Sequence, residues 1–343
     1  EHTDYNEGFV LPIAINRATY AAIALREDDI ARVASTFSDA VVELNIGQLG
    51  EASGWAAYPL GVAHVLGASK GFDLFIDSDV PVGAGLSSSA AIECAVALGL
   101  DELLGLGNDR RALARIGQRA ENEVVGAPTG IMDQSASLLG KVDHAVFLDC
   151  QSLEVENVAL GFAAAALEVV IIDTRVAHRL NDGGYAARRA ACEAAAKAFE
   201  VPSLRHLSLE TLEAGRELVD DVTYRRARHI ITENDRVLSF VAALKLGDFK
   251  RCGELMVQSH VSMRDDFEIS VDELDTAVET SMRHGAVGAR MTGGGFGGAS
   301  IALCPIEKIS DLTNSVYAEF ELVGYARPDI FTVNAADGAS RLI

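Results

Sequence analysis

The order of hydrophobic and polar positions indicates strands in some stretches of the chain and helices in others. The stretch FDLFIDSDV at 72–80 alternates with a period of two, which predicts a strand that runs into a glycine-containing loop. Residues 9–25 are also expected to form strands. Residues 53–66 are expected to form a helix that Pro59 kinks or interrupts. The stretch 87–105 is apolar almost all round, so it predicts a buried helix.

The same patterns predict further helices and strands along the chain. A helix at about 110–124 would turn four residues inward: Leu113, Ile116, Ala120 and Val124. Later elements are expected as a strand ending near 150, a strand at 167–173, a helix from 183 onward, and a strand, glycine loop and strand at 288–305. Strands and helices mixed without a strict βαβ rhythm predict an α+β fold.

A change in composition near 150–165 indicates a domain boundary. The chain of 343 residues is long enough for two domains, at roughly 150 residues for each. We therefore expect an N-terminal domain at 1–160 and a C-terminal domain at 161–343.

Composition and charge narrow the possible partners. The formal net charge of −21 repels nucleic acid and anionic membrane surfaces, so neither is expected as a partner. The longest apolar run, at 158–172, is interrupted by Gly161 and Glu168 and is too short to span a bilayer. Five single cysteines without a C-x-x-C pair predict reduced thiols and a cytoplasmic protein.

The stretch PVGAGLSSSAA at 81–91 is the most informative about chemistry. Gly83 and Gly85 allow the backbone to approach a ligand closely. The run Ser87–Ser89 then opens a helix, where unpaired N–H groups and the helix dipole favour an anion. A serine-capped helix is the alternative, but no Glu or Gln follows at the spacing of a capping box. The loop is therefore expected to bind a phosphate, although the chain has neither a Walker loop nor a dinucleotide fingerprint.

Several motifs together resemble one known family. The loop at 81–91 resembles the nucleotide motif of the GHMP small-molecule kinases, and EHTDYN with GFVLP at 1–12 resembles the sugar-binding signature of the galactokinases within that family. MTGGGFGG at 291–298, TGIMDQ at 129–134 and LDCQSLE at 148–154 are similar to further galactokinase motifs. These landmarks cover nearly the whole chain in the expected order.

The resemblance implies a fold and a reaction. The fold would be a two-domain GHMP kinase, with an N-terminal domain like ribosomal protein S5 domain 2 and a ferredoxin-like C-terminal domain. The reaction would be ATP-dependent phosphorylation of D-galactose at C1, giving galactose 1-phosphate and ADP with Mg²⁺ as cofactor. The partners would be D-galactose and MgATP, and the protein would be a monomer.

The resemblance also implies roles for particular residues. Asp133 would accept or orient the proton of the C1 hydroxyl group, although a loop aspartate that caps a helix is the alternative. The residues implied to bind the sugar are Glu1, His2, Thr3, Asp4, Gly130, Asp133 and Tyr185. Those implied to bind ATP are Gly83, Ala84, Gly85, Leu86, Ser87, Ser88, Ser89, Trp55 and Ser35. The implied metal ligands are Ser89 and Glu121.

Each role has a structural alternative. Trp55, which pairs with Tyr58 in a W-x-x-Y pattern, is as well explained by core packing as by adenine binding. Tyr185 has ordinary packing as its alternative, and a helical glutamate such as Glu121 is usually a solvated charge. The glycine loop from Gly293 to Gly298 is expected to close against the phosphate and the sugar, with a plain hairpin as its alternative.

Other activities remain open at this stage. A catalytically silent sensor of galactose and ATP would share these motifs, although such proteins tend to carry lesions in the serine run, which is intact here. An N-acetylgalactosamine kinase would need extra room at C2 of the sugar. A mevalonate kinase fits less well, because EHTDYN is typical of a site rich in hydroxyl contacts.

The chain departs from the family pattern at its first residue. Galactokinases carry a segment like GRVNLIG immediately before EHTDYN, with an arginine thought to stabilise the transferring phosphoryl group. Arginines of this kind contribute on the order of 10³-fold or more to the rate of other phosphoryl-transfer enzymes. Residues 1–343 alone are therefore expected to be weakly active or inactive.

Overall fold

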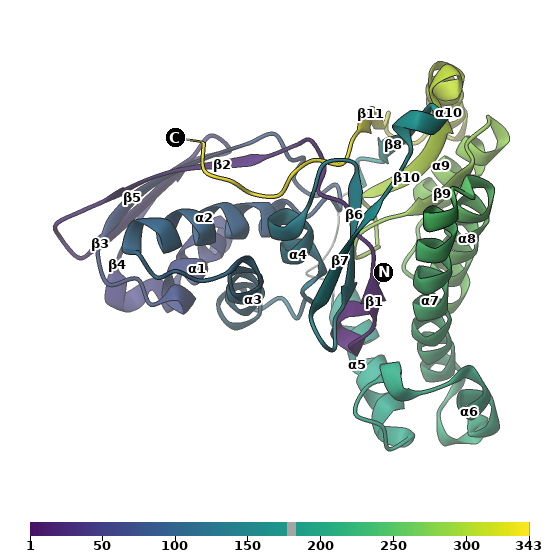
Figure 1. Cartoon of the computed structure of the whole chain (residues 1–343), viewed down its shortest axis with the longest axis horizontal. Helices are drawn as coiled ribbons and strands as arrows, with labels where there is room; N and C mark the ends of the chain where they lie inside the picture. The colour runs from purple at the N-terminus through teal and green to yellow at the C-terminus, as the bar shows by residue number, and fades with distance from the viewer. Residues whose placement is uncertain (177–182, 343) are drawn as a thin grey trace. The chain divides into compact units, whose positions relative to one another are not determined.

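The computed structural model describes residues 1–176 and 183–342, which fold into two compact units (Figure 1). The first unit consists of Glu1–Leu11, Val82–Leu86 and Asp143–Asn334. The second consists of Pro12–Pro81, Ser87–Val142 and Ala335–Ile343. Both units mix sheets with helices, so the α+β prediction is confirmed. The division at residue 160 stays a prediction.

The second unit contains a four-stranded sheet with the order β2-β5-β3-β4. Its strands are β2 (Thr19–Leu25), β3 (Ile30–Ser35), β4 (Ser38–Asn45) and β5 (Phe72–Ser78). The predicted strand at 72–80 is confirmed by β5, in which Phe72, Leu74 and Ile76 are buried while Phe75 between them is exposed. This alternation gives the sheet one inward face, against which the helix Ser88–Leu104 packs.

Four α-helices belong to the second unit: α1 (Ala57–Leu66), α2 (Ser88–Leu104), α3 (Arg110–Ala120) and α4 (Met132–Leu139). Helix α2 packs against β2 and against the other three helices. Its residues Cys94, Val96 and Leu100 are completely buried, which confirms the predicted buried helix at 87–105.

The expected kink or interruption at Pro59 is wrong. A 3₁₀ turn at Gly54–Ala56 leads into α1, and the helix then continues unbroken to Leu66. Pro59 lies in the first turn of α1, where a backbone N–H has no partner within the helix. Proline is tolerated at such a position because the group that it lacks is not needed there.

The predicted helix at 110–124 is confirmed with a change of geometry near its end. Helix α3 passes into a π-helical turn at Glu121–Val125, which ends at Gly126 in the left-handed region with φ 82°. Leu113 and Ala120 of the predicted inward seam are buried. Glu121 at the start of the π turn is also buried, with 6% of its surface exposed. Turns of this kind are rare and frequently occur at functional sites.

The first unit contains two sheets. A three-stranded antiparallel sheet has the order β1-β6-β7, with β1 (Phe9–Val10), β6 (His144–Asp149) and β7 (Glu154–Ala159). The second sheet is antiparallel with the order β11-β8-β10-β9. Its strands are β8 (Leu167–Asp173), β9 (Gly288–Met291), β10 (Ala299–Pro305) and β11 (Asp329–Val333).

Helices cover both faces of the larger sheet. The α-helices of this unit are α5 (Gly184–Ala198), α6 (Leu209–Ala214), α7 (Asp221–Leu246), α8 (Phe249–Ser262), α9 (Asp272–Arg283) and α10 (Ile309–Val323). Ala302 of β10 packs in the core with α9 and α10, whereas its neighbour Leu303 packs in a separate core with Met256 of α8. The alternation of side chains along β10 therefore gives each face of the sheet its own core.

The remaining helical pieces are short. Among residues 1–176 and 183–342, the 3₁₀ turns besides Gly54–Ala56 are Asp4–Asn6, Ile46–Glu51, Ala163–Ala165, Leu204–His206, Arg216–Leu218 and Ile306–Lys308. A second π turn lies at Met263–Phe267. Within the described part of the chain, no helix combines the length and the apolar character that crossing a membrane requires.

Candidate functional site

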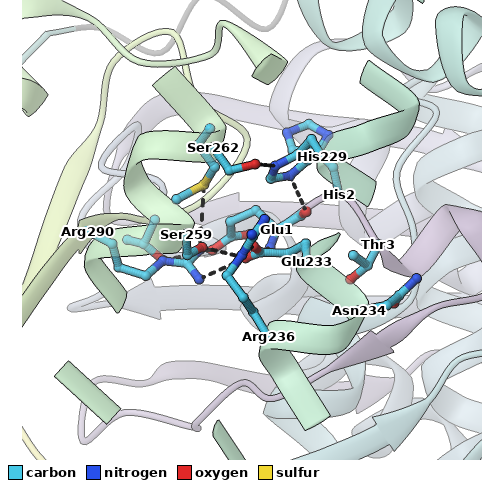
Figure 2. A network of polar contacts seen from close by, with 12 residues as sticks. Glu1, His2, Thr3, His229, Glu233, Asn234, Arg236, Ser259, Ser262 and Arg290 are labelled. Carbon is cyan, nitrogen blue, oxygen red and sulfur yellow. Dashed lines mark hydrogen bonds and ion pairs between the residues drawn. The ribbon is translucent and has the colours of Figure 1, made fainter. Parts of the chain in front are cut away.

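Glu1, the first residue of the sugar signature, lies almost buried in the first unit (Figure 2). Its Oε1 atom accepts hydrogen bonds from Nη2 of Arg290 at 2.8 Å, from Oγ1 of Thr292 at 3.2 Å and from the backbone N–H of Gly293 at 3.3 Å. Burial works to raise the pKa of Glu1, but the positive charges around it, first its own backbone ammonium group and then Arg290, leave that pKa below its ordinary value. Glu1 is therefore a fixed, ionised acceptor.

His2 is buried and uses both ring nitrogens within the protein. Nε2 lies 3.2 Å from the carbonyl oxygen of Gly294, which can only accept, so Nε2 carries the proton. Burial lowers the pKa of His2 to about 3, so the ring is neutral and Nδ1 accepts from the hydroxyl of Tyr5 at 2.8 Å. The ring of Tyr185 lies 4.7 Å from that of His2. The structure thus brings together two predicted sugar contacts that are far apart in the sequence.

Thr3 and Asp4 complete the signature in different ways. Thr3 is completely buried, and its hydroxyl donates to the carbonyl oxygen of Phe9 at 2.7 Å. Asp4 is half-buried and accepts a hydrogen bond from the backbone N–H of Tyr5 at 3.0 Å. The hydroxyl of Thr3 therefore supports the turn, whereas the carboxylate of Asp4 remains partly open to solvent. The sugar-binding roles of both residues stay predictions.

Four charged side chains of alternating sign lie next to one another in the first unit: Glu1, Arg290, Glu233 and Arg236. We call this set the charge ladder (Figure 2). Nη1 of Arg290 lies 3.5 Å from Oε1 of Glu233, and Nε of Arg236 donates to Oε2 of Glu233 at 2.5 Å. Ser259 of α8 also donates to Oε1 of Glu233. Burial opposes ionisation of Glu233, but nearby positive charges, first the backbone ammonium group of Glu1 and then Arg236, hold its pKa well below the ordinary value.

The glycine loop between β9 and β10 lies against the segment Val82–Leu86 of the same unit. A Cβ atom on Gly293 would lie 2.8 Å from the carbonyl oxygen of Gly85, and one on Gly298 would lie 3.2 Å from that of Ala84. Gly293 and Gly85 also have positive φ angles of 80° and 70°. Only glycine allows both this backbone conformation and this approach. The later glycine loop is thus in contact with the predicted phosphate-binding segment.

The serine run opens α2 without capping it through a side chain. Ser87 occupies the N-cap position in the left-handed region, with φ 60°, and its hydroxyl makes no capping hydrogen bond. Ser88 and Ser89 form the start of the helix and are half-buried. The first N–H groups of a helix have no partners within it, and here the usual serine cap is missing as well. This geometry favours the anion-binding interpretation over the capped helix.

An acidic cluster without cationic partners among the described residues lies in the second unit, formed by Glu93, Glu121, Thr129 and Gln134. Nε2 of Gln134 donates to Oε2 of Glu93 at 2.9 Å and to Oε2 of Glu121 at 3.0 Å. Thr129 donates to the same oxygen of Glu121 at 2.7 Å. Burial, followed by the charge of Glu121, raises the pKa of Glu93 well above its ordinary value. Among the described residues, the two carboxyl groups of the cluster receive hydrogen bonds from neutral donors.

This cluster fits a divalent cation that keeps most of its waters. Glu121 offers a buried, oriented carboxylate, and magnesium prefers such hard oxygen ligands. Over residues 1–176 and 183–342, no group of three or more His, Cys, Asp and Glu side chains could enclose a metal ion. One or two protein ligands, as predicted with Ser89 and Glu121, are sufficient for Mg²⁺ held mainly by a nucleotide.

Asp133 lies beside the acidic cluster, in the first turn of α4. It is half-buried, and its negative charge contributes to the raised pKa of Glu93 after burial and Glu121. Gly130 is buried in the segment just before α4. Asp133 and Gly130 belong to the second unit, whereas the other predicted sugar contacts belong to the first.

Two predicted nucleotide contacts in the second unit carry buried polar atoms without partners in the described structure. These atoms are Nε1 of Trp55 and Oγ of Ser35. The ring of Trp55 meets Phe37 edge to face at 5.4 Å, and Phe37 is 39% exposed. Pure core packing leaves both polar atoms unexplained, so a ligand with hydrogen-bonding groups suits this place better.

Sequence reasoning missed four residues that the structure adds to these sites: Arg290, Glu233, Glu93 and Phe37. Arg290 comes immediately before the MTGGGFGG motif. The available signal for it was a basic residue next to a family motif in an acidic chain. Glu233 and Glu93 lie within long helices, where a glutamate is usually solvated. Their burial depends on tertiary packing and leaves no mark in the local pattern.

Comparison with known proteins identifies the family. Residues 57–141 match the model of the GHMP kinases N terminal domain, residues 240–321 match GHMP kinases C terminal, and residues 1–25 match the galactokinase galactose-binding signature. A curated galactokinase of Streptomyces coelicolor is 44% identical over 352 aligned residues, which cover 100% of this chain and 91% of that protein. The chain belongs to the galactokinase family.

Further members of the galactokinase family agree with this. A galactokinase of Mycobacterium bovis is 42% identical, with 99% of this chain and 95% of that protein covered. The crystal structure of Lactococcus lactis galactokinase complexed with galactose has a TM-score of 0.95 at 35% identity and covers 100% of this chain and 92% of that one. A mevalonate kinase structure, with a TM-score of 0.65 at 18% identity, shares the fold alone. The predicted galactokinase resemblance and GHMP kinase fold are confirmed.

Proposed function

We propose that this chain phosphorylates D-galactose at C1 with ATP, giving α-D-galactose 1-phosphate and ADP. The observation that carries the proposal is the match of residues 1–25 to the galactose-binding signature, within a chain that is similar to curated galactokinases from end to end. The Lactococcus lactis relative, whose structure was solved with galactose, supports the same sugar.

The sugar is bound by the signature and by residues that lie apart from it in the sequence. Glu1 and Asp4 supply carboxylates, which accept hydrogen bonds from sugar hydroxyls. His2 and Tyr185, whose rings lie together, form an aromatic wall for the apolar face of the ring. Thr3 holds the turn, and Gly130 and Asp133 complete the set. A site with this many oriented polar groups discriminates strongly against sugars that lack one hydroxyl.

Asp133 acts on the reacting hydroxyl group. The C1 oxygen of galactose attacks the γ-phosphorus of ATP, the bond to the bridging oxygen breaks, and ADP leaves. The carboxylate of Asp133 accepts the C1 proton or orients it during this attack. Phosphoryl transfer depends mainly on positioning and charge stabilisation, so an aspartate held at a helix start is well suited to the task.

The nucleotide is held by the loop and helix start at 83–89 and by Trp55 and Ser35. The segment Gly83–Leu86 and the serine run Ser87–Ser89 bind the phosphates through backbone N–H groups and hydroxyls. Trp55 and Ser35 lie on the side of the base and offer it the polar atoms that lack protein partners. Local donors of this kind are needed because the net charge of −21 repels ATP.

Mg²⁺ is the proposed cofactor, with Ser89 and Glu121 as its protein ligands. When bound, the ion neutralises charge on the phosphate oxygens during transfer. Gln134 and Thr129 orient the carboxylate of Glu121 for this role. We also propose that the protein is a cytoplasmic monomer.

ADP release in a coupled assay tests the proposal. With ATP and Mg²⁺, the protein is expected to release ADP when galactose is added. It should release much less ADP with N-acetylgalactosamine or mevalonate. EDTA is expected to abolish the reaction. Asp133→Asn is expected to lower kcat by about 10² or more without weakening galactose binding. The exposed Asp39→Asn serves as the matched control. Binding of both ligands without ADP release would overturn the proposal in favour of a sensor.

A further inference from the structure

The guanidinium group of Arg290 is engaged at all three of its nitrogen atoms. Nη2 donates to Oε1 of Glu1 at 2.8 Å, Nη1 to Oε1 of Glu233 at 3.5 Å, and Nε to the carbonyl oxygen of Met291 at 2.9 Å. Nη2 also lies 3.7 Å from the sulfur atom of Met263. Only 16% of the side chain is exposed. Arg290 is therefore held in one orientation by partners on several sides.

The carboxylate of Glu1 is oriented by this arrangement. Among the described residues, its hydrogen bonds all go to Oε1, from Arg290, Thr292 and Gly293. Three donors on one oxygen fix the rotation of the carboxylate plane and leave Oε2 as the oxygen for a ligand. An acceptor fixed before binding loses little conformational freedom when a hydroxyl group donates to it.

Glu233 supports Arg290 from the opposite side. It is 1% exposed and receives hydrogen bonds from Arg236 on α7 and from Ser259 on α8. The two arginines and the two glutamates of the ladder alternate and balance in charge. A buried charge set is tolerated only when it is paired and hydrogen-bonded in this way. Glu233 thereby keeps Arg290 from swinging away from Glu1.

We infer that Arg290, braced by Glu233, is a positioning residue for galactose, because it holds the carboxylate of Glu1 at the angle at which Oε2 meets one particular sugar hydroxyl. The inference rests on the proposed function, in which Glu1 binds the sugar. Arg290 lies in β9, just before the glycine loop. The inference gives this strand a role in selecting one hydroxyl group of the sugar, and this role is separate from phosphate binding.

Arginine is required here for geometric reasons. Its planar fork donates in three directions at once, whereas a lysine ammonium at the same place is a single point on a flexible stem. Arg290→Lys keeps the charge but cannot reach Glu1, Glu233 and the Met291 carbonyl together. The variant therefore separates positioning from simple charge compensation.

Galactose affinity measured by calorimetry tests the inference in the full-length protein without relying on turnover. Arg290→Lys and Arg290→Met are each expected to raise the Kd for galactose about tenfold or more, since they remove a hydrogen bond between charged groups that orients the acceptor. The Kd for ATP is expected to stay unchanged. Arg251→Met, which removes an exposed arginine paired with Glu254 on α8, is the matched control and should leave both constants unchanged.

Monodeoxy analogues of galactose identify the hydroxyl that is concerned. Each analogue is measured with the unaltered protein and with Glu1→Ala. The analogue that both proteins bind equally well lacks the hydroxyl group that donates to Glu1. Arg290→Lys is expected to leave the affinity for that analogue unchanged and to weaken the others. Arg290→Lys added to Glu1→Ala should cost little more than Glu1→Ala alone, because both act through one contact. A merely structural role would weaken all sugars alike.

The remaining outcomes are also decisive. If Arg290→Met fails to fold, Arg290→Lys and Glu233→Gln are the variants that count, and Glu233→Gln is expected to weaken galactose less than Arg290→Lys does. If Glu1→Ala loses galactose binding while Arg290→Lys binds galactose normally, this inference is overturned and the proposed function stands. No galactose binding by the unaltered protein would overturn the proposed function and this inference with it.

Discussion

The two buried groups of carboxylates in this protein differ in what surrounds them. In the charge ladder of the first unit, Glu1 and Glu233 alternate with two arginines. In the acidic cluster of the second unit, Glu93 and Glu121 share the amide of Gln134, and the hydrogen bonds they accept come from neutral donors. Glu233 and Glu93 are buried to a similar degree, with 1% and 0% of their surface exposed, so burial alone does not explain how they behave.

The pKa directions show the consequence of this difference. Positive neighbours hold the pKa of Glu233 well below its ordinary value against the effect of burial, whereas burial and a neighbouring carboxylate raise that of Glu93 well above it. In the ladder each carboxylate already has a cationic partner. The acidic cluster lacks one, which is why it suits Mg²⁺ and the ladder does not.

Removing one charge from the ladder should have the largest effect. Glu233→Gln is expected to lower the free energy of unfolding by about 3 kcal/mol, because it leaves Arg236 and Arg290 without their shared buried counter-charge. Urea unfolding at pH 7 measures this. The control is Glu254→Gln, which breaks an exposed pair with Arg251 and should change that free energy by less than about 1 kcal/mol. Equal values for the two variants would contradict the assignment of the ladder.

His2 shows how burial near the ladder affects a base. Its folded pKa of about 3 lies below the value near 6.5 of an unfolded histidine. The unfolded chain therefore takes up a proton below pH 6.5 that the folded chain refuses. The contribution of His2 to stability is complete above pH 6.5 and should be lost as the pH falls towards 3, by about 1.4 kcal/mol per pH unit.

Urea unfolding of the protein and of His2→Gln between pH 6 and pH 4 measures this contribution. The difference in unfolding free energy between the two proteins is the relevant quantity, because the titration of all other groups cancels in it. A difference that stays constant over this range would show that His2 is not held neutral in the fold.

The smallest effect is expected at Glu93. Glu93→Gln should change the free energy of unfolding at pH 7 by about 1 kcal/mol or less, because glutamine keeps an oxygen that accepts the hydrogen bond from Gln134 and carries no charge that burial opposes. Because the pKa of Glu93 is raised in the fold, Glu93 contributes stability at pH values below about 4.5, the pKa of an unfolded glutamate. This contribution is lost as the pH rises through the folded pKa. Relative to the unaltered protein, Glu93→Gln should therefore gain stability as the pH rises through the folded pKa of Glu93. A loss as large as that of Glu233→Gln would refute the contrast between the two groups.

The sequence predicted those elements whose pattern is local. Strand β5 alternates over most of its length, α2 is apolar almost all round, and glycines separate β9 from β10, so each was recognisable. Strand β7, with the sequence EVENVA, was missed because half of its residues are charged or amidated and exposed. The π turn at Glu121–Val125 was also missed, since an extra residue in one helical turn does not alter the amphipathic pattern enough to be seen.

The candidate site was predictable only where its residues belong to compact motifs. Asp133 and the serine run stand in short segments that resemble family motifs, so they could be named from the sequence. Arg290 and Glu233 could not, because their meaning depends on partners that the fold brings from distant parts of the chain. No local pattern records that a helical glutamate will face a strand arginine.

The pairing of β1 with β6 has a consequence for how the protein is made. Phe9 of β1 pairs with Asp149, and Glu1 pairs with Arg290. At a synthesis rate of about 5–20 residues per second, the sugar-signature segment must wait roughly 15 to 60 seconds until Arg290 has been added to the chain. Nascent chains would therefore acquire galactose affinity only at a late stage of synthesis.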